Sequence, residues 1–415
     1  MATAPGPRLT GRIAFTYPGF TVYQMARFLV VTGMEMQSVA VGWQVYEITH
    51  RALDLGLVGL AQFLPGLLLF LASGHAADHF DRRRLLLICY AGFGLASAFL
   101  LGISWHAPHA VLPIYVVLVF IGVVRSMSGP VSRAILPQLV AEEHFQNAVA
   151  WNSSIFMTAT ILGPALGGLI YAAFRGAPAV YASAFVLSAV SWVIAMRITA
   201  RPRSKPPEDV NLRTVLAGLH YIWEQKLILG SISLDMFAVL LGGAVALLPI
   251  YASEILNTGP WGLGLLRSAP GVGAAVMAVL VAHRPLQRRV GATMLWCVAG
   301  FGVFTILFGL SRSFTLSLIA LFLTGACDMV SVIVRGTLVQ LATPDEMRGR
   351  VNAVDMIFIG VSNELGQFES GLTAAWFGAV PAVIIGGIGT LAVIGTWSWL
   401  FPELRKADRM LSPAE

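Results

Sequence analysis

The sequence has little charge and little cysteine for a chain of its length. Only 12% of its 415 residues are Asp, Glu, Lys or Arg, whereas soluble domains carry about 25%. The three cysteines, Cys89, Cys297 and Cys327, all lie within apolar runs, which predicts small buried side chains rather than a disulfide framework or a metal cluster. The formal charge of +6 is dispersed around apolar runs, which argues against a nucleic-acid-binding surface.

The signatures of several enzyme classes are also missing. The sequence contains no Gly-x-x-x-x-Gly-Lys-Ser/Thr motif, so we do not expect a P-loop that binds ATP. It contains neither His-Glu-x-x-His nor Gly-x-Ser-x-Gly, so an intramembrane protease or lipid transferase stays an alternative without a catalytic motif. No cofactor and no metal are expected.

Long apolar runs dominate the rest of the chain. The composition is 57% hydrophobic and the mean hydropathy is +0.76. Many runs reach the length of about 20 residues that a helix needs to cross a bilayer. The sequence therefore predicts an all-α membrane protein with about twelve transmembrane helices, at residues 21–47, 55–73, 84–104, 111–132, 147–171, 177–197, 229–251, 262–282, 291–310, 314–335, 351–371 and 374–400.

A polar linker divides the predicted spans into two sets of six. Residues 198–228 begin with a Pro- and Arg-rich stretch and continue with apolar residues near helical spacing, which predicts an amphipathic helix on the membrane surface. The predicted organisation is an N-terminal six-helix bundle at 21–197 and a C-terminal one at 229–400. Tails at 1–20 and 401–415 complete the chain.

The two sets of spans are repeats of one another. Residues 59–66 (GLAQFLPG) align with residues 264–271 (GLLRSAPG), and residues 133–139 (RAILPQL) align with residues 335–341 (RGTLVQL). The matches include glycine, proline, arginine and glutamine, which random apolar helices would not share in register. Two parallel six-helix repeats are therefore expected.

The distribution of basic residues predicts the orientation in the membrane. With twelve spans, both termini lie on one side. Only Arg51, Arg175 and Arg312 then fall in outer loops, while most other basic residues flank inner segments. Lysine and arginine favour cytoplasmic loops, so both termini are predicted to be cytoplasmic. No feature requires an oligomer, and a monomer is expected.

Three short stretches resemble signatures of the major facilitator superfamily of transporters. Residues 74–84 (GHAADHFDRRR) resemble the loop between its helices 2 and 3, and Arg125–Gly129 resembles its Arg-x-x-x-Gly element. Gly163–Gly168 (GPALGG) resembles the end of an element associated with antiporters, although Ala150 and Ala159 replace two upstream glycines. The resemblance implies a secondary transporter with two parallel six-helix repeats.

Within that superfamily, the chain resembles bacterial exporters of the group that contains the enterobactin exporter and macrolide efflux proteins. The residues that carry this resemblance are Met36–Glu47, Asp81–Arg84, Arg133–Val140, Gly163–Gly168 and Val380–Gly387. It implies export of a small amphipathic molecule, a drug or a siderophore, by proton antiport with alternating access in the bacterial inner membrane. A facilitator or importer on the same fold is the alternative.

The resemblance also assigns roles to the two short elements. Gly74, Asp78, Arg82 and Arg83 are predicted to form a cytoplasmic gate, in which Asp78 belongs to a latch between the halves. The antiporter-like motif consists of Gly163, Pro164, Gly167 and Gly168.

Charged residues inside apolar spans are costly and mark candidate functional sites. We expect Glu35 to form an ion-pair cluster with Arg27 and Arg125 and to carry the coupled proton; a static pair that fixes helix packing is the alternative. Asp235 and Asp328 are further proton-coupling candidates. Asp355, Glu364 and Glu369 are expected near span ends, in contact with solvent.

The substrate cavity is expected to be mainly apolar and aromatic with a few polar groups. Its candidate lining residues are Gln37, Trp43, Gln44, Tyr46, Gln62, Asn152, Asn363 and Gln367. A large amphipathic molecule fits this composition better than a sugar does. The expected partners are therefore a small-molecule substrate, protons and the lipid bilayer.

Overall fold

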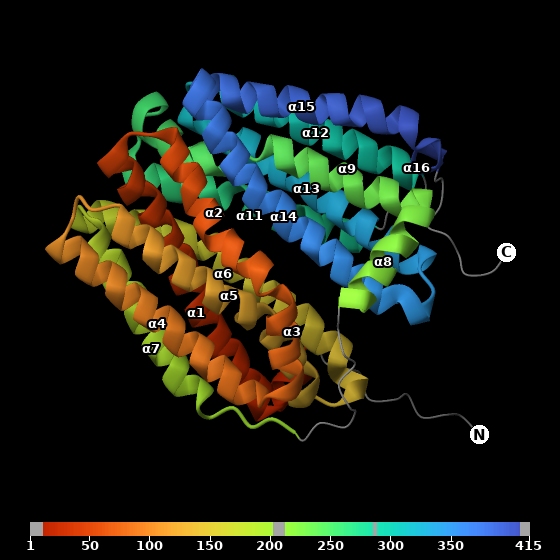
Figure 1. Ribbon diagram of the computed structural model, residues 1–415, viewed down its shortest axis with the longest axis horizontal. Helices are drawn as coiled ribbons and strands as arrows, with labels where there is room; N and C mark the ends of the chain where they lie inside the picture. The colour runs from red at the N-terminus through yellow and green to blue at the C-terminus, as the bar shows by residue number, and fades with distance from the viewer. Residues whose placement is uncertain (1–10, 202–211, 285–288, 407–415) are drawn as a thin grey trace.

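The computed structural model describes residues 11–201, 212–284 and 289–406. Helices joined by short turns make up nearly all of these residues, and no strand occurs among them. Figure 1 shows the helices arranged as two bundles that lie side by side, the N-terminal one below and the C-terminal one above.

The N-terminal half crosses the bundle six times. Its helices are α1 (Pro18–Thr49), α2 (Ala52–Leu68), α3 (Phe70–His79), α4 (Arg82–His106), α5 (Leu112–Leu139), α6 (Phe145–Phe174) and α7 (Ala177–Ala195). The predicted span 55–73 is bent, because the chain leaves helical geometry at Leu69 and continues as α3. Pro65 lies one turn before the bend and has no N–H to donate within the helix.

The C-terminal half repeats this pattern after the linker helix α8 (Leu212–Glu224). Its first crossing consists of α9 (Lys226–Gly242), a 3-10 turn η3 (Ala244–Leu247), α10 (Leu248–Ile250) and a π-helical turn η4 (Tyr251–Ile255). The later helices are α11 (Gly259–His283), α12 (Val290–Leu310), α13 (Phe314–Ala342), α14 (Asp345–Phe377), α15 (Ala379–Leu400) and the short α16 (Pro402–Lys406).

The predicted all-α architecture with two six-helix repeats is confirmed. In the described part of the chain, nine helical segments are long and apolar enough to cross a membrane. The other three crossings are α1, the bent α2–α3 pair and α14, which lie in the same bundles. Polar residues lower the hydropathy of α1 and α14, and α2 is apolar but only 17 residues long.

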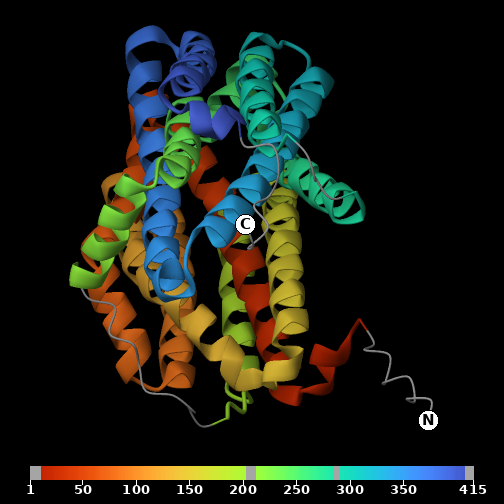
Figure 2. The same ribbon diagram turned by 90° about the vertical axis from the view of Figure 1, so that its right-hand side faces the viewer.

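The two halves touch at one end of the molecule and separate at the other. Both termini lie at the same end (Figure 1), here named the terminal end, and the opposite end is the far end. In Figure 2 the terminal end faces the viewer, with the N-terminal half below and the C-terminal half above. The main contacts between halves join α6 with α11 and α2 with α14.

These contacts between halves are concentrated toward the far end because glycines allow close approach there. A Cβ atom on Gly168 of α6 would lie 2.4 Å from the carbonyl oxygen of Pro260 and 2.9 Å from the Cα atom of Gly264 on α11. Gly56 of α2 meets Gly371 of α14 in the same way, at 2.6 Å from its Cα atom. Small residues at such crossings let two membrane helices pack backbone to backbone.

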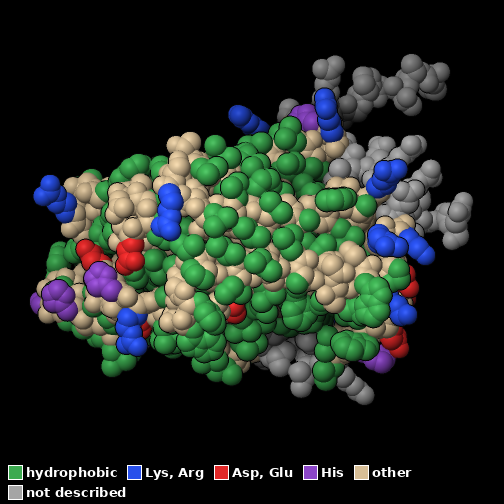
Figure 3. Space-filling model, turned by 90° about the horizontal axis from the view of Figure 1, so that it is seen from above, with side chains coloured by type: hydrophobic (Ala, Val, Ile, Leu, Met, Phe, Trp, Pro, Cys, Tyr) green, Lys and Arg blue, Asp and Glu red, His purple; other side chains and the backbone are tan. Residues whose placement is uncertain are grey.

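The outer surface has the composition expected of a protein in lipid. Figure 3 shows a broad band of hydrophobic side chains between two ends that carry most of the visible charges. Large apolar side chains are exposed on the helices, for example Trp296 at 78% and Trp399 at 80%. Water would oppose such exposure, whereas a bilayer's hydrocarbon core favours it.

The linker helix α8 packs against the beginning of α14. Ile222 is buried, and a Cβ atom on Gly218 would lie 2.7 Å from the carbonyl oxygen of Arg350. Trp223 on the other face is 70% exposed, as expected of an amphipathic helix at a membrane surface. The Pro-rich part of the linker, residues 202–211, lies outside the described residues.

Candidate functional site

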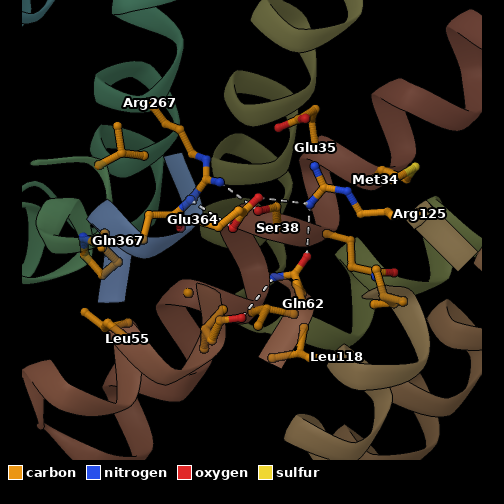
Figure 4. Close-up of a pocket in the computed structure, with 18 of the residues that line it drawn as sticks. Met34, Glu35, Ser38, Leu55, Gln62, Leu118, Arg125, Arg267, Glu364 and Gln367 are labelled. Atoms are coloured by element: carbon orange, nitrogen blue, oxygen red, sulfur yellow. Dashed lines mark hydrogen bonds and ion pairs between the residues drawn. The ribbon is translucent and has the colours of Figure 1, made fainter. Parts of the chain in front are cut away.

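A cavity of about 130 Å³ lies between the two halves near the middle of the bundle. Its wall is built from α1, α2, α4 and α5 of the N-terminal half and from α11, α14 and the chain before α11 in the C-terminal half. Figure 4 shows that charged and amide side chains converge on this space. Its polar lining residues are Glu35, Gln37, Ser38, Gln62, Ser97, Arg125, Arg267, Glu364 and Gln367.

Arg125 of α5 connects the two halves across the cavity. Its Nη1 atom lies 3.9 Å from Glu364 Oε1 on α14 and donates a hydrogen bond of 3.3 Å to Gln62 Oε1 on α2. The Arg125 side chain is 47% exposed and the Glu364 side chain 20%. The pair is therefore accessible from the cavity and can exchange its partner for water or for a bound molecule.

Arg267 of α11 makes the second polar connection between halves. Its Nη2 atom donates a hydrogen bond of 2.8 Å to Ser38 Oγ on α1, as Figure 4 shows. Within the C-terminal half, Gln367 Nε2 donates to Glu364 Oε2 at 3.3 Å. Arg267 occupies the position of the second repeat that corresponds to Gln62 in the first. The two repeats thus direct two long polar side chains, Gln62 and Arg267, into the same cavity from opposite sides.

Glu35 lines the cavity without a direct partner. It makes no ion pair or hydrogen bond with any described residue, but it lies close enough to Arg267 and Glu364 to interact with both charges. A Cβ atom on Gly163 of α6 would lie 2.5 Å from the Cβ atom of Glu35, so the backbone of α6 holds this side chain against the cavity. We name Glu35, Arg125, Arg267 and Glu364 the cavity cluster.

A second, mainly apolar chamber adjoins this space toward the terminal end. It has a volume of about 470 Å³ and shares Gln62, Arg125 and Glu364 with the charged cavity. Its wall comes from α2, α5 and α14, with apolar residues such as Phe63 and Ile357. The combined space therefore has a charged end and a mainly apolar end, which is also lined by Arg133.

The antiporter-like motif lies where α6 crosses α1 and α11. Gly163 faces Glu35, Gly167 faces the backbone of Met36, and Gly168 faces α11. Pro164 is buried within α6, and its carbonyl oxygen lies 2.5 Å from the position of a Cβ atom on Gly264. The motif thus supplies both the wall behind Glu35 and the contact between halves.

The predicted cluster of Arg27, Glu35 and Arg125 is not formed. The Nη1 atom of Arg27 donates to the backbone carbonyl of Asn152 at 3.3 Å and to the Oδ1 atom of the same residue, and its guanidinium lies over the ring of Phe156. Arg27 and Glu35 are about 12 Å apart along the axis of α1, and α6 offers Arg27 a nearer partner. Asn152 is therefore a support for Arg27 and not a lining residue.

Three of the eight residues predicted to line the substrate cavity lie in the wall of this space and the others lie elsewhere; that the space binds substrate stays a prediction. Gln37, Gln62 and Gln367 line the space. Gln44 is buried within the N-terminal half, where it accepts a hydrogen bond from Tyr181, and Trp43 packs against Tyr171. Tyr46 and Asn363 also lie elsewhere: Tyr46 donates to Glu254 at the far end, and Asn363 is exposed and bonds to the carbonyl of Ile359.

The sequence-based prediction missed one cavity residue, Arg267, and placed another, Glu364, in the wrong surroundings. Arg267 was not a candidate, although its alignment with Gln62 in the repeat was a signal for it. Glu364 was expected near a span end in solvent, yet it lies in the cavity beside Arg125. The reason is the length of α14, which has 33 residues and extends beyond the predicted span 351–371 at both ends.

The predicted gate lies at the terminal end of the N-terminal half. Gly74 and Asp78 belong to α3, and the Asp78 side chain lies outside the described residues. Arg82 donates to the carbonyl of Ala134 at 2.6 Å, and Arg83 donates to that of Met196. Both carbonyls belong to the same half, so these described contacts do not include a latch between halves.

Asp235 and Asp328, the other candidates, lie away from the cavity. They belong to α9 and α13, within the C-terminal half, near Arg335. Asp355 on α14 was expected in solvent, but it pairs with the same arginine at 2.5 Å.

The fold and the sequence agree with known transporters. The enterobactin exporter EntS of Shigella boydii serotype 4 is 25% identical over 394 residues, and EntS of Citrobacter koseri is 26% identical over 399 residues; each match covers 94% of both chains. Among solved structures, a mutant of the nucleoside transporter NupG superposes with a TM-score of 0.75 at 11% identity, covering 92% of this chain and 100% of that one.

Two further structures have the same fold. A bacterial homologue of the human lysosomal transporter Spinster, in an inward-facing and occupied conformation, gives a TM-score of 0.74 at 10% identity and covers 96% of this chain and 99% of its own. A D-xylose–proton symporter gives 0.70 at 15% identity, with 94% and 99% covered. The transmembrane secretion effector family matches residues 13–413. The chain is therefore a member of this family of multi-pass membrane transporters, within the major facilitator superfamily.

Proposed function

We propose that this protein exports a small amphipathic molecule from the cytoplasm and exchanges it for protons. The observation that carries the proposal is the two-part space between the halves, with a charged end at the cavity cluster and an apolar end lined by α2, α5 and α14. An amphipathic molecule would place its polar part at the charged end and its apolar part at the apolar end. The similarity to enterobactin exporters supports the direction and extends the substrate class to siderophores.

The terminal end is the cytoplasmic side in this proposal. The outer loops would then contain Arg51, Arg175 and Arg312, while most other basic residues flank the terminal end, in agreement with the preference of basic loops for the cytoplasm. The apolar chamber extends toward this end, and the halves are in contact at the other. The conformation described here would thus receive substrate from the cytoplasm.

Glu35 is the proposed proton carrier of the cavity. It has no ion-pair partner in the described structure, so a proton can bind without first breaking a pair. In general, a nearby arginine favours the ionised form of a carboxyl group, whereas loss of surrounding water favours its neutral form. Alternating access changes both surroundings, which allows uptake of a proton on one side and release on the other.

The test is transport of a fluorescent amphipathic cation or a catecholate siderophore into inside-out vesicles. An imposed proton gradient, acidic inside, should drive uptake by the native chain. Glu35→Gln should lose the dependence on the gradient and keep exchange of substrate across the membrane. Glu143→Gln is the matched control, since Glu143 is 73% exposed on the surface.

Three outcomes would contradict the proposal or one of its parts. Uptake by the native chain that ignores the gradient would favour the facilitator alternative. Uptake in the opposite orientation only, in right-side-out vesicles, would favour an importer. If the gradient drives Glu35→Gln as well as the native chain, Glu35 is not the carrier.

A further inference from the structure

A second charged cluster lies inside the C-terminal half, apart from the cavity. Arg335 of α13 is its centre: its Nη2 atom lies 3.2 Å from Asp235 Oδ2 on α9, and its Nη1 atom lies 2.5 Å from Asp355 Oδ1 on α14. Asp328, on α13 two turns before Arg335, lies beyond ion-pair distance of the guanidinium but interacts with the charges of Asp235 and Arg335. We name these four residues the C-half cluster.

The centre of the cluster is buried and the charges of the cluster do not balance. The side chains of Arg335 and Asp235 are only 4% and 8% exposed. Two carboxylates pair with one guanidinium and the carboxylate of Asp328 lies nearby, so the fully ionised cluster would carry two excess negative charges within a membrane-embedded bundle. Burial of an unpaired charge costs several kcal/mol, and carboxylates that share a site do not all ionise together. The imbalance therefore favours bound protons.

A metal cation fits the cluster less well than protons do. The described residues contain no group of three acidic, histidine or cysteine side chains arranged to hold a metal ion. The Arg335 guanidinium already occupies the place between Asp235 and Asp355 where a cation would bind. Its buried Nε atom also has no hydrogen-bond partner, so it can adjust when the charge on a neighbouring carboxyl group changes.

The other titratable groups near the cluster are neutral thiols. Cys327 on α13 lies beside Asp328 and also interacts with Cys297 of α12. Ser331 donates a hydrogen bond of 3.4 Å to Asp235 Oδ1. No charged residue occurs in α15, which also packs against α9. The helices α8 and α11 also pack against this region, but the described partners of His220, Arg267 and His283 are Glu224, Ser38 and Val279. Arg335 is the positive charge that pairs with the carboxylates of the cluster.

We propose that the C-half cluster is a proton-binding site, separate from the substrate cavity, in which the carboxylates of Asp235, Asp328 and Asp355 share protons taken from water at the terminal end. Each uptake converts a carboxylate to a carboxylic acid and needs no other reactant. Asp355 is the entry point, because its side chain is 18% exposed and that of Asp235 only 8%.

The helix α14 connects this site with the cavity. It carries Asp355 of the C-half cluster and, nine residues later, Glu364 of the cavity cluster. The two positions are separated by about 14 Å along the helix. A tilt of α14 that separates Glu364 from Arg125 would also move Asp355 relative to Arg335. Protonation of the cluster could thus be linked to the opening of the cavity, an extension that rests on the proposed proton antiport.

Infrared spectroscopy of the purified full-length protein tests the site without transport. The native chain should show the carbonyl stretch of protonated carboxylic acids at neutral pH, and this band should weaken toward alkaline pH. Asp328→Asn, Asp235→Asn and Asp355→Asn should each reduce the pH-dependent band, by up to the share of one carboxyl group. Glu143→Gln, with its exposed carboxylate, should leave the band unchanged.

The two proposals fail in different ways. A pH-dependent band that is the same in all three aspartate variants would overturn the proton-binding site, whatever the vesicles show. Transport by the native chain that ignores the proton gradient would overturn proton antiport and leave the infrared result intact. If the aspartate variants lose the band but keep gradient-driven transport, the site binds protons and the link through α14 is wrong.

Discussion

The cavity cluster and the C-half cluster contain the same kinds of residue but differ in balance and in surroundings. The cavity cluster has two arginines and two glutamates, is reached from the cavity and joins the two halves. The C-half cluster has one arginine and three aspartates, is buried at its centre and lies within one half. A balanced cluster that is partly exposed in a cavity can exchange partners when the halves move, whereas an unbalanced, buried one is suited to hold protons.

The largest expected effect comes from removal of the arginine of the C-half cluster. Arg335→Gln leaves three carboxylates without a positive charge and should lower the free energy of unfolding by about 3–5 kcal/mol. Arg125→Gln in the cavity cluster should cost about 1 kcal/mol or less, because Arg125 is 47% exposed. Thermal unfolding in detergent measures both.

The double variant Arg335→Gln/Asp235→Asn is the control for that comparison. It removes one charge of each sign and should therefore recover part of the free energy of unfolding that Arg335→Gln loses. Equal destabilisation by Arg335→Gln and Arg125→Gln would show that the two clusters do not differ in burial as described.

The next effect concerns the contact that positions the cavity cluster. Gly168→Val would bring its side chain against Pro260 and Gly264 and should cost about 1–3 kcal/mol through overpacking. Transport should fall strongly because the far end cannot close. Gly102→Val on α4 is the matched control, since a Cβ atom there meets nothing within 4 Å. A transport rate for Gly168→Val equal to that of the control would contradict the role of this crossing.

A third comparison separates substrate recognition from the use of the gradient. Glu364→Gln removes a charge from the cavity and should raise KM by about tenfold, or about 1.4 kcal/mol, with the gradient still effective. Asp328→Asn should leave KM near the native value and reduce the acceleration by the gradient. Initial rates in vesicles, with and without an imposed gradient, distinguish these patterns. The reverse assignment of the two effects would refute the distinction between the clusters.

The smallest effects are expected from the serines that bond to each cluster. Ser38→Ala removes the hydrogen bond of 2.8 Å from Arg267 and should cost about 1 kcal/mol. Ser331→Ala removes a longer bond of 3.4 Å to Asp235 and should cost less. Unfolding temperatures compare them, and a greater loss in Ser331→Ala would mean that the C-half cluster depends on neutral donors more than its geometry indicates.

Much of the fold could be predicted because lipid imposes a simple rule on the sequence. A span must be apolar over about 20 residues, so the helices and their number follow from hydropathy. The repeat was visible because Gly, Pro, Arg and Gln recur in register at residues 59–66 and 264–271. Helix ends and the bend at Leu69 were harder to predict from the sequence, since they depend on local backbone geometry.

The charged sites were predictable as residues but not as partners. Glu35 and Arg125 both line the cavity, but the ion-pair cluster predicted for them with Arg27 is not formed, and Arg27 bonds to Asn152. Helical spacing shows which residues share a face of one helix and gives no information about the neighbouring helix. For the same reason the pairing of Arg335 could not be predicted, because its partners Asp235 and Asp355 lie 100 positions before it and 20 after it in the sequence.

The sequence by itself determined that this chain is a helical membrane protein built from two repeats, because the bilayer requires apolar spans and duplication leaves matching residues. It also determined which spans contain charges. The tertiary structure decided how these charges are divided: two of each sign between the halves, and within one half Arg335 paired with two aspartates and a third aspartate nearby. That division depends on which helices meet, and helix packing is set by shape and small-residue contacts that one-dimensional patterns do not encode.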